Sequence, residues 1–324
     1  MTKIALISAT GTGRKRTLPA LRDSTLCKVV AIHGRDSQSL AILAEEFDVE
    51  HTYTDLELLI QERHFDIAMI CSPPFLHEDQ ARILLDAGIP TFVEKPLALT
   101  AGGTRRLMEH AGASDTPLGI AHHLRHTDIY RAIRDCLDSG RLGAIDTATF
   151  EWSFAMNREA PSAKWKLDPT LNGPTTFSDA GIHCIDVGVG LFGPGQVVAA
   201  SGSVPQPPIV TWESCDALAL HGSTRVLYRA SRLHGPFSNQ LLISGTKGEL
   251  IAPGFFGEKP ASKLHIQTSQ GNETLTFEER NPYQAEVEDF ATFVSKPESP
   301  RLGTSPEEAL AAAEMLDEIS RLIS

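Results

Sequence analysis

The segment Lys3-Ile4-Ala5-Leu6-Ile7-Ser8-Ala9-Thr10-Gly11-Thr12-Gly13 decides the fold of the amino-terminal half. It begins with a short apolar run, typical of a buried strand, and continues into a turn that contains two glycines. A glycine-containing turn directly after the first strand is where a dinucleotide-binding motif belongs. An ordinary strand-to-helix turn is the alternative interpretation.

Further apolar runs follow at 28–32, 67–71, 91–94 and 118–121. Between them lie amphipathic segments, several preceded by residues that can cap a helix, such as Ser37, Asp55 and Thr100. Strict alternation of strand and helix is typical of a doubly wound parallel sheet. We therefore predict an α/β Rossmann domain over residues 1–122.

After Ala121 the pattern changes, because β-branched and aromatic residues become frequent and short turns separate the runs. We predict strands at 144–154, 197–204, 217–221, 225–231, 241–244 and 249–251. We predict helices at 129–137, 177–191, 285–294 and 306–322. The expected second domain, residues 123–324, is α+β with an open, mostly antiparallel sheet, and its C-terminal helices can pack back on the first domain.

The composition excludes several classes of protein. The 324 residues are 41% hydrophobic and carry a net charge of −12, which argues against nucleic-acid or anionic membrane partners. No apolar run approaches membrane-spanning length, and the N-terminal run is too short for a signal peptide. The five cysteines are scattered and form no CxxC pair, which favours reduced thiols and a cytoplasmic location.

The turn after the first strand departs from the G-x-G-x-x-G pattern. Ser8 and Thr10 occupy the first two glycine positions, and only Gly13 matches. The run Arg14-Lys15-Arg16 follows at the start of a helix, where the helix dipole disfavours cations. A bound anion would explain these cations, and a solvated basic face is the alternative.

The second strand ends in Ile32-His33-Gly34-Arg35-Asp36. The acidic residue that usually holds the ribose hydroxyls of NAD is replaced by Gly34, and Arg35 follows with a guanidinium that can fork onto a phosphate. We therefore predict a preference for NADP(H) over NAD(H). Asp36 remains a possible ribose ligand.

Two clusters indicate acid–base chemistry. Lys95 lies just past the carboxyl end of a strand, at the edge where open α/β sheets bind ligands, although a surface Lys-Pro turn is the alternative.

If residues 177–191 are helical, Asp179, His183 and Asp186 share one face. A structural His–Asp helix and a metal site are the alternatives. The spacing is not HExxH, so we predict no metal.

The sequence resembles the glucose–fructose oxidoreductase / myo-inositol dehydrogenase (Gfo/Idh/MocA) family over nearly its whole length. The motifs that carry the resemblance are Ser72-Pro73-Pro74-Phe75-Leu76-His77, Glu94-Lys95-Pro96, Trp165, Gly173, Asp179-x-Gly181-x-His183-x-x-Asp186, Asn281-Pro282-Tyr283 and Asp289-Phe290.

The resemblance implies hydride transfer between a nicotinamide cofactor and a hydroxyl or keto carbon of a sugar, sugar derivative or cyclitol. It implies that Lys95, Asp179 and His183 are catalytic, with His183 as general base, and that the Lys95–Pro96 bond is cis. The expected cofactor contacts are Ser8, Thr10, Gly11, Thr12, Gly13, Arg14, Arg35, Ser72, Pro73, His77, Glu94, Lys95 and Trp165. The expected substrate contacts are His122, Arg125, Asp179 and His183, with a packing role as the alternative for His122 and Arg125.

Two other functions remain open from the sequence. A non-catalytic NAD(P)-binding regulator of the same fold would explain the altered glycine pattern. A tightly bound cofactor acting as an internal redox relay for elimination or hydrolysis is a further hypothesis. We also predict a homodimer or homotetramer, because the second sheet has one face available for another subunit.

Overall fold

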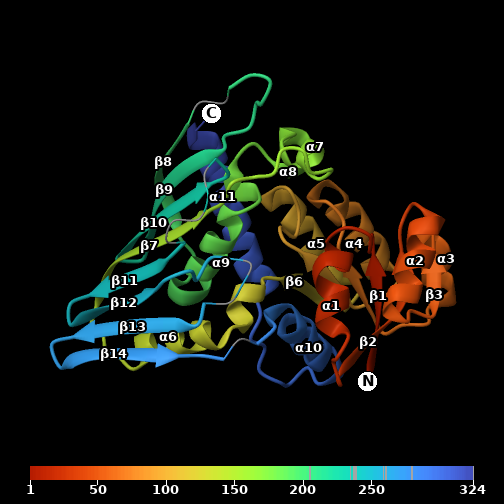
Figure 1. Cartoon of the computed structure of the whole chain (residues 1–324), viewed down its shortest axis with the longest axis horizontal. Coiled ribbons are helices and arrows are strands. Elements are labelled where there is room, and N and C mark those ends of the chain that lie inside the picture. The colour runs from red at the N-terminus through yellow and green to blue at the C-terminus, as the bar shows by residue number, and fades with distance from the viewer. Residues whose placement is uncertain are drawn as a thin grey trace. The chain divides into compact units, whose positions relative to one another are not determined.

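The computed structural model describes residues 1–203, 206–233, 235, 239–257, 259, 261–278 and 280–323 (Figure 1). The chain divides into two compact units. The first comprises Met1–Ala98, Gly102–His123 and Asn281–Pro306, and the second comprises Leu99–Ala101, Leu124–Arg280 and Glu307–Ser324. Val204, the last residue of one predicted strand, lies outside the described residues. Within the described part of the chain, no helix is long and apolar enough to cross a membrane.

The first unit contains a six-stranded parallel sheet in the order β3-β2-β1-β4-β5-β6. Its strands are β1 (Thr2–Ile7), β2 (Cys27–His33), β3 (His51–Tyr53), β4 (Ile67–Ile70), β5 (Thr91–Glu94) and β6 (Leu118–Ala121). The apolar runs form these strands because a central parallel strand is buried on both faces, and the side chains from Ile4 to Ile7 have no exposed surface. This strand order confirms the predicted Rossmann architecture.

The helices of the first unit connect these strands, except for the last one, which comes from a later part of the chain. They are η1 (Gly13–Thr17, a π-helical turn), α1 (Leu18–Leu21), α2 (Ser37–Phe47), α3 (Leu56–Glu62), η2 (Pro74–Leu76), α4 (His77–Asp86), α5 (Ala101–Ala113) and α10 (Pro282–Ser295). Asp55 caps α3, as predicted. The predicted cap of α2 is wrong by one residue, because the carboxylate of Asp36 accepts the Ser39 N–H at 2.6 Å.

Helix α10 belongs to the first unit although it lies near the end of the chain. It packs against α1, β2 and β6. Phe290 stacks on Phe92 with ring centroids 4.9 Å apart. Its ring also occupies the space that a Cβ at position 119 would need, so Gly119 allows this packing. The core of the Rossmann unit is therefore completed by a segment distant in sequence.

The second unit contains an eight-stranded sheet in the order β14-β13-β12-β11-β7-β10-β9-β8. Its strands are β7 (Ile145–Ser153), β8 (Gln196–Gly202), β9 (Ser214–His221), β10 (Thr224–Ser231), β11 (Leu241–Gly245), β12 (Gly248–Ala252), β13 (Lys263–Thr268) and β14 (Gly271–Thr276). Among these described strands, only β7 and β10 pair in parallel. The sheet is open and mostly antiparallel, as predicted.

The remaining helices are η3 (His123–His126), α6 (Asp128–Asp138), α7 (Ala163–Lys166), α8 (Pro169–Asn172), η4 (Thr176–Ser178), α9 (Gly181–Phe192) and α11 (Pro306–Ile323). Helices α6, α9 and α11 bury apolar side chains in the same core as the inward-facing residues of the second sheet, such as Phe150 and Tyr228. Outward-facing residues alternate with these along β9 and β10, which is the two-faced pattern of an antiparallel sheet.

The predicted helix at 177–191 is wrong at its start. A 3-10 turn ends at Ser178, and the helix begins only at Gly181, so Asp179 lies between the two elements. The ring of Phe177 occupies the place that a Cβ on Gly181 would need, which fixes this junction by packing rather than by helix periodicity.

Candidate active site

The turn after β1 has Ser8 and Thr10 at two positions where the dinucleotide-binding pattern has glycine. Ser8 has φ of 60°, the left-handed conformation that glycine adopts at little cost. The Ala9 N–H donates to the His33 carbonyl at 2.9 Å, which ties the turn to the end of β2. A Cβ on Gly11 would meet no atom within 4 Å, so a phosphate has room to approach this backbone.

Gly13 lies where the first helix passes closest to the sheet. A Cβ at this position would lie 3.6 Å from Leu6 Cδ1 and from Cys71 Sγ, in ordinary van der Waals contact with both. The Arg14 N–H donates to the Ala9 carbonyl at 2.7 Å and closes the turn. These features fit the requirement for close helix–strand packing in a dinucleotide-binding unit.

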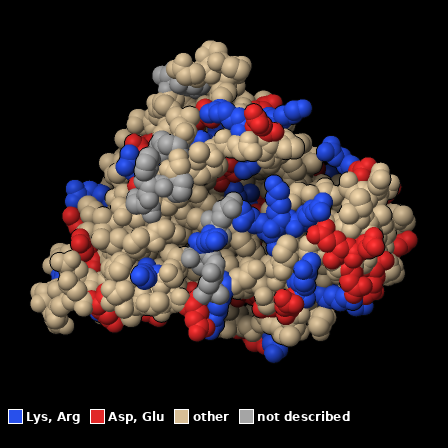
Figure 2. Space-filling view, in the orientation of Figure 1, with Lys and Arg blue, Asp and Glu red and all other residues tan. Residues whose placement is uncertain are grey.

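Two of the three cations at the start of this helix contact protein groups. Arg14 pairs with Glu46 on α2 at 3.0 Å, and the Arg16 guanidinium lies 5.0 Å from the ring centroid of Tyr283. Lys15 and Arg35 are exposed. Figure 2 shows Lys and Arg gathered over α1, with Asp and Glu beside them over α2 and α3. Because the Arg14–Glu46 pair is exposed, it is weak enough to leave Arg14 available to an anion.

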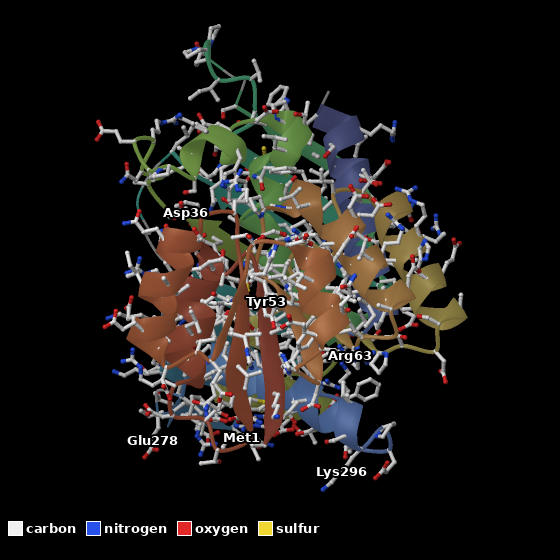
Figure 3. All side chains as sticks on the ribbon, turned by 90° about the vertical axis from the view of Figure 1, so that its right-hand side faces the viewer. Met1, Asp36, Tyr53, Arg63, Glu278 and Lys296 are labelled. Carbon is white, nitrogen blue, oxygen red and sulfur yellow. The ribbon has the colours of Figure 1, made fainter. Side chains whose placement is uncertain are left out.

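The end of β2 carries the residues on which the predicted cofactor preference depends. Figure 3 marks the two ends of these parallel strands, with Met1 at the amino end and Asp36 at the carboxyl end. Hydrogen bonds from Ser39 lower the pKa of Asp36, because its carboxylate caps α2. The carboxylate of Asp36 is thus engaged by the helix, while Arg35 beside it is exposed.

His77 joins the ends of β4 and β5. Its Nδ1 lies 2.7 Å from the Pro96 carbonyl oxygen, and its Nε2 lies 2.8 Å from the Ser72 carbonyl oxygen. The side chain has no exposed surface, and burial lowers the pKa of His77. Both ring nitrogens of His77, a predicted cofactor contact, thus face backbone carbonyl oxygens of the segments that follow β4 and β5.

Lys95 and Glu94 stand at the carboxyl end of β5 and are half-buried. The Lys95–Pro96 peptide is cis, which confirms the expectation from the resemblance. Ser72, which follows β4, donates its hydroxyl to Gln80 Oε1 at 2.7 Å, and Pro73 comes next. Since parallel strands end at one edge, the first unit brings the turn after β1, Arg35, Ser72 and Lys95 to the same edge of its sheet.

The second unit places Asp179 just before α9 and His183 in the first turn of that helix. Asp179 is 8% exposed and accepts two contacts from Lys166 Nζ, at 3.2 and 2.9 Å. His183 lies in the first turn of the helix, where its backbone N–H donates to the Ala180 carbonyl oxygen at 3.2 Å. The indole of Trp152 packs against its ring, with centroids 4.6 Å apart.

Asp186 does not belong to this cluster. Arg125 donates from Nε to Asp186 Oδ2 at 2.9 Å and contacts Oδ1 at 2.8 Å, and its third nitrogen donates to Glu308 at 2.7 Å. Burial lowers the pKa of Arg125 more than any other single cause, but Asp186, Tyr130 and Glu308 together outweigh burial and raise it. The prediction that Asp179, His183 and Asp186 share one helical face is therefore wrong. Asp179 precedes the helix, and Asp186 forms a buried ion pair with Arg125. This ion pairing favours the packing role for Arg125.

The other predicted contacts are distributed between the units. His122 directly follows β6 in the first unit and is 1% exposed. Trp165 lies on α7 in the second unit and is half-buried, with Lys166 Nζ 5.6 Å from its ring centroid. Sequence reasoning missed Trp152 and Lys166, because neither stands in a motif and each is identified only by its tertiary contact.

Comparison with known proteins is consistent with this geometry. The model of an oxidoreductase family with an NAD-binding Rossmann fold matches residues 2–122, and the GFO/IDH/MocA C-terminal domain model matches residues 130–251. The chain is 24% identical to a 1,5-anhydro-D-fructose reductase of Ensifer adhaerens, a match that covers 90% of this chain and 87% of that one. It is 26% identical to a D-xylose 1-dehydrogenase (NADP(+)) of Haloferax volcanii, covering 97% and 95%.

Solved structures share the fold. The 3-ketoreductase KijD10 of Actinomadura kijaniata, solved with NADP and TDP-benzene, superposes with a TM-score of 0.88 at 20% identity, covering 99% of this chain and 98% of that one. The two family models together span most of both structural units. The chain therefore belongs to the Gfo/Idh/MocA family of NAD(P)-dependent oxidoreductases.

Proposed function

We propose that Lys95, Asp179 and His183 form the catalytic set of this NAD(P)-dependent dehydrogenase or reductase. The enzyme moves a hydride between its nicotinamide cofactor and a hydroxyl or keto carbon of a sugar, sugar derivative or cyclitol. The observation that carries the assignment is that Asp179 and His183 are both buried at the start of α9, with Trp152 packed against the His183 ring. A buried imidazole with a carboxylate near it is suited to general acid–base work.

The roles follow from the chemistry of each group. The nicotinamide, when bound, accepts or supplies the hydride. His183 takes the substrate hydroxyl proton in the oxidative direction and returns it in the reductive direction. Lys95 donates a hydrogen bond to the same oxygen and stabilises the negative charge that develops there. Asp179 binds the substrate and orients it.

We propose that the enzyme prefers NADP(H). Support comes from the end of β2, where Gly34 replaces the usual acid, the carboxylate of Asp36 caps α2 and Arg35 is exposed. An exposed guanidinium at this position is suited to a 2′-phosphate. The remaining predicted contacts, at the turn from Ser8 to Arg14 and at Ser72, Pro73, Glu94, Lys95 and Trp165, belong to the same proposal.

The cofactor preference predicts a selective loss. Arg35→Ala should raise the Kd for NADPH by about tenfold, the effect of roughly 1.4 kcal/mol, and leave the Kd for NADH nearly unchanged. Fluorescence titration measures both constants. Arg22→Ala, which removes another exposed arginine of the same unit, is the control. If the unaltered protein binds NADH at least as tightly as NADPH, the preference is wrong.

The alternative of a non-catalytic regulator rested on the altered glycine pattern. Ser8 adopts the left-handed backbone conformation that glycine adopts at little cost, so the chain makes this turn without a glycine at position 8. Turnover of sugars, inositols and sugar acids with both cofactors separates the two functions. Binding of NAD(P)H without turnover across this panel would favour the regulator.

We further propose that the protein works in the cytoplasm as a homodimer or homotetramer. All five cysteines are buried free thiols, which suits a reducing compartment. The outward face of the second sheet carries exposed apolar residues, including Val198 at 44% and Leu218 at 37% exposed. Light scattering of the purified protein measures the oligomeric state, and a monomer would contradict this part of the proposal.

A further inference from the structure

We propose that Lys166 is a positioning residue that holds the Asp179 carboxylate in its working orientation and is itself seated by Arg232. This inference rests on the proposed role of Asp179 in the reaction. It adds to the site a residue that stands in none of the motifs that identified the catalytic set.

The contact between Lys166 and Asp179 is built to orient a carboxylate. The Lys166 ammonium lies 3.2 Å from Oδ1 and 2.9 Å from Oδ2, so it bridges both oxygens. The two side chains are 26% and 9% exposed. A charge-assisted contact removed from bulk water is screened less than a surface pair, and it restrains rotation of the carboxylate plane.

Two buried side chains hold the main chain of Lys166 through its carbonyl oxygen. Its carbonyl oxygen accepts a hydrogen bond from Arg232 at 2.9 Å and another from the Asn172 amide at 3.2 Å. Arg232 and Asn172 are each 1% exposed. Arg232 also donates to Thr211 Oγ1 at 3.2 Å, which anchors its guanidinium in the second unit.

These hydrogen bonds to the Lys166 main chain matter because a lysine side chain is long and loses considerable rotamer entropy when it is held in one place. Helix α7 is only four residues long and could not fix the backbone of Lys166 by itself. The buried guanidinium fixes the start of the Lys166 side chain, and Asp179 fixes its end. Asp179 is thereby held at the entrance of α9, next in the chain to the turn that carries His183.

Helix α7 provides a matched control. Lys164 lies two positions before Lys166 on the same short helix, and it is exposed. The two residues have the same charge and the same local secondary structure, and Lys166 contacts the Asp179 carboxylate. A general effect of removing a cation from α7 would therefore appear in both variants.

The experiment is a double-mutant cycle on the full-length protein, with Lys166→Met, Asp179→Asn, the double variant, Lys166→Arg and Lys164→Met. Steady-state kcat and KM, the Kd for NADPH and the melting temperature are measured for each. Because misplacing a reacting group by about 1 Å costs up to about 100-fold, Lys166→Met should lower kcat by about 10- to 100-fold and leave the Kd for NADPH nearly unchanged. Lys166→Arg should recover part of the loss, and Lys164→Met should remain within about twofold of the unaltered protein.

The cycle separates positioning from a merely structural role. If Lys166 acts through Asp179, the double variant is no slower than Asp179→Asn alone. Additive losses in kcat, or a loss in Lys164→Met equal to that in Lys166→Met, would overturn the inference. If the unaltered protein turns over no compound of the substrate panel, the proposed function fails. The melting temperatures of the same variants then decide whether Lys166 and Asp179 are coupled, and additive shifts would overturn the inference independently.

Discussion

His77 has no exposed surface, and both of its ring nitrogens face backbone carbonyl oxygens that flank the predicted site. A neutral imidazole donates to only one of these carbonyls at a time, and burial favours the neutral ring by lowering the pKa of His77. The side chain thus ties the loop after β4 to Pro96, directly after Lys95. A residue can support a reaction in this way without contacting a ligand.

Replacing this side chain tests that role. His77→Phe should lower the free energy of unfolding by about 1–3 kcal/mol, because it leaves a buried carbonyl oxygen without a donor. It should also lower kcat more than it raises the Kd for NADPH, because Lys95 loses its support. Urea unfolding, steady-state kinetics and fluorescence titration provide the three readouts.

The control for this prediction is His110→Phe, since His110 lies on the surface of α5 beside Asp86. That variant should leave both stability and turnover nearly unchanged. A His77 variant with normal kcat but a strongly raised Kd would show that the imidazole serves the cofactor directly, contrary to the supporting role.

Helix α9 contains two ionisable residues in different surroundings. His183 lies at its start with Asp179 before it, whereas Asp186 lies one turn further on and pairs with Arg125 in the interior. Arg125 and Asp186 are 3% and 1% exposed in their side chains. Removing one partner of a buried ion pair leaves an uncompensated charge, and this costs more than the pair itself contributes.

The pair therefore predicts an asymmetric response. Asp186→Asn should lower the free energy of unfolding by about 3–5 kcal/mol, and combining Arg125→Met with Asp186→Leu should recover most of that loss. The exposed pair Arg225–Asp146 is the control, since Asp146→Asn should change stability by less than about 1 kcal/mol. Chemical denaturation measures each value. Equal losses in Asp186→Asn and in the double variant would show that volume rather than charge controls the site.

The sequence predicted the elements whose periodicity is strong. The apolar runs of the first domain and helix α11 lie where the pattern placed them, because burial on both faces or on one helical stripe leaves a clear signal. The hairpin β13–β14 was missed, since nearly all residues of β14 are exposed and no apolar alternation marks it. The start of α9 was missed because it depends on the fit of Phe177 against Gly181.

The candidate site was predictable to the extent that motifs marked it. Lys95, Asp179 and His183 stand in recognisable patterns at the carboxyl end of a strand and near the start of a helix. Lys166 and Trp152 do not, because their roles arise from contacts between segments distant in sequence. The assignment of α10 to the Rossmann unit likewise depends on the packing of Phe290, which a one-dimensional pattern does not contain.

Three buried histidines make the stability of the whole chain depend on pH. Burial is the largest cause that lowers the pKa of His33, His77 and His221 from the ordinary value of 6.5. Above about pH 7 these rings are neutral in both the folded and the unfolded chain. Below about pH 6.5 the unfolded chain gains protons that the folded chain does not, so stability falls with pH.

We therefore expect the free energy of unfolding to decrease between about pH 7 and pH 5.5, before most carboxylates begin to titrate. Urea unfolding at several pH values measures the slope. His221→Gln removes one of the three groups while keeping polar atoms near the Tyr228 hydroxyl and the Gly193 carbonyl, and it should flatten the slope. A slope that rises toward acid pH would contradict the assignment of neutral buried rings.

We propose that His183 transfers the proton of the substrate hydroxyl. Single-turnover oxidation of NADPH in the presence of a keto substrate tests this role, with the unaltered protein and with His183→Ala. The hydride-transfer rate should fall by about 10²- to 10⁴-fold in the variant, while the Kd for NADPH should stay nearly the same. A His183→Ala enzyme that transfers hydride at close to the normal rate would contradict it.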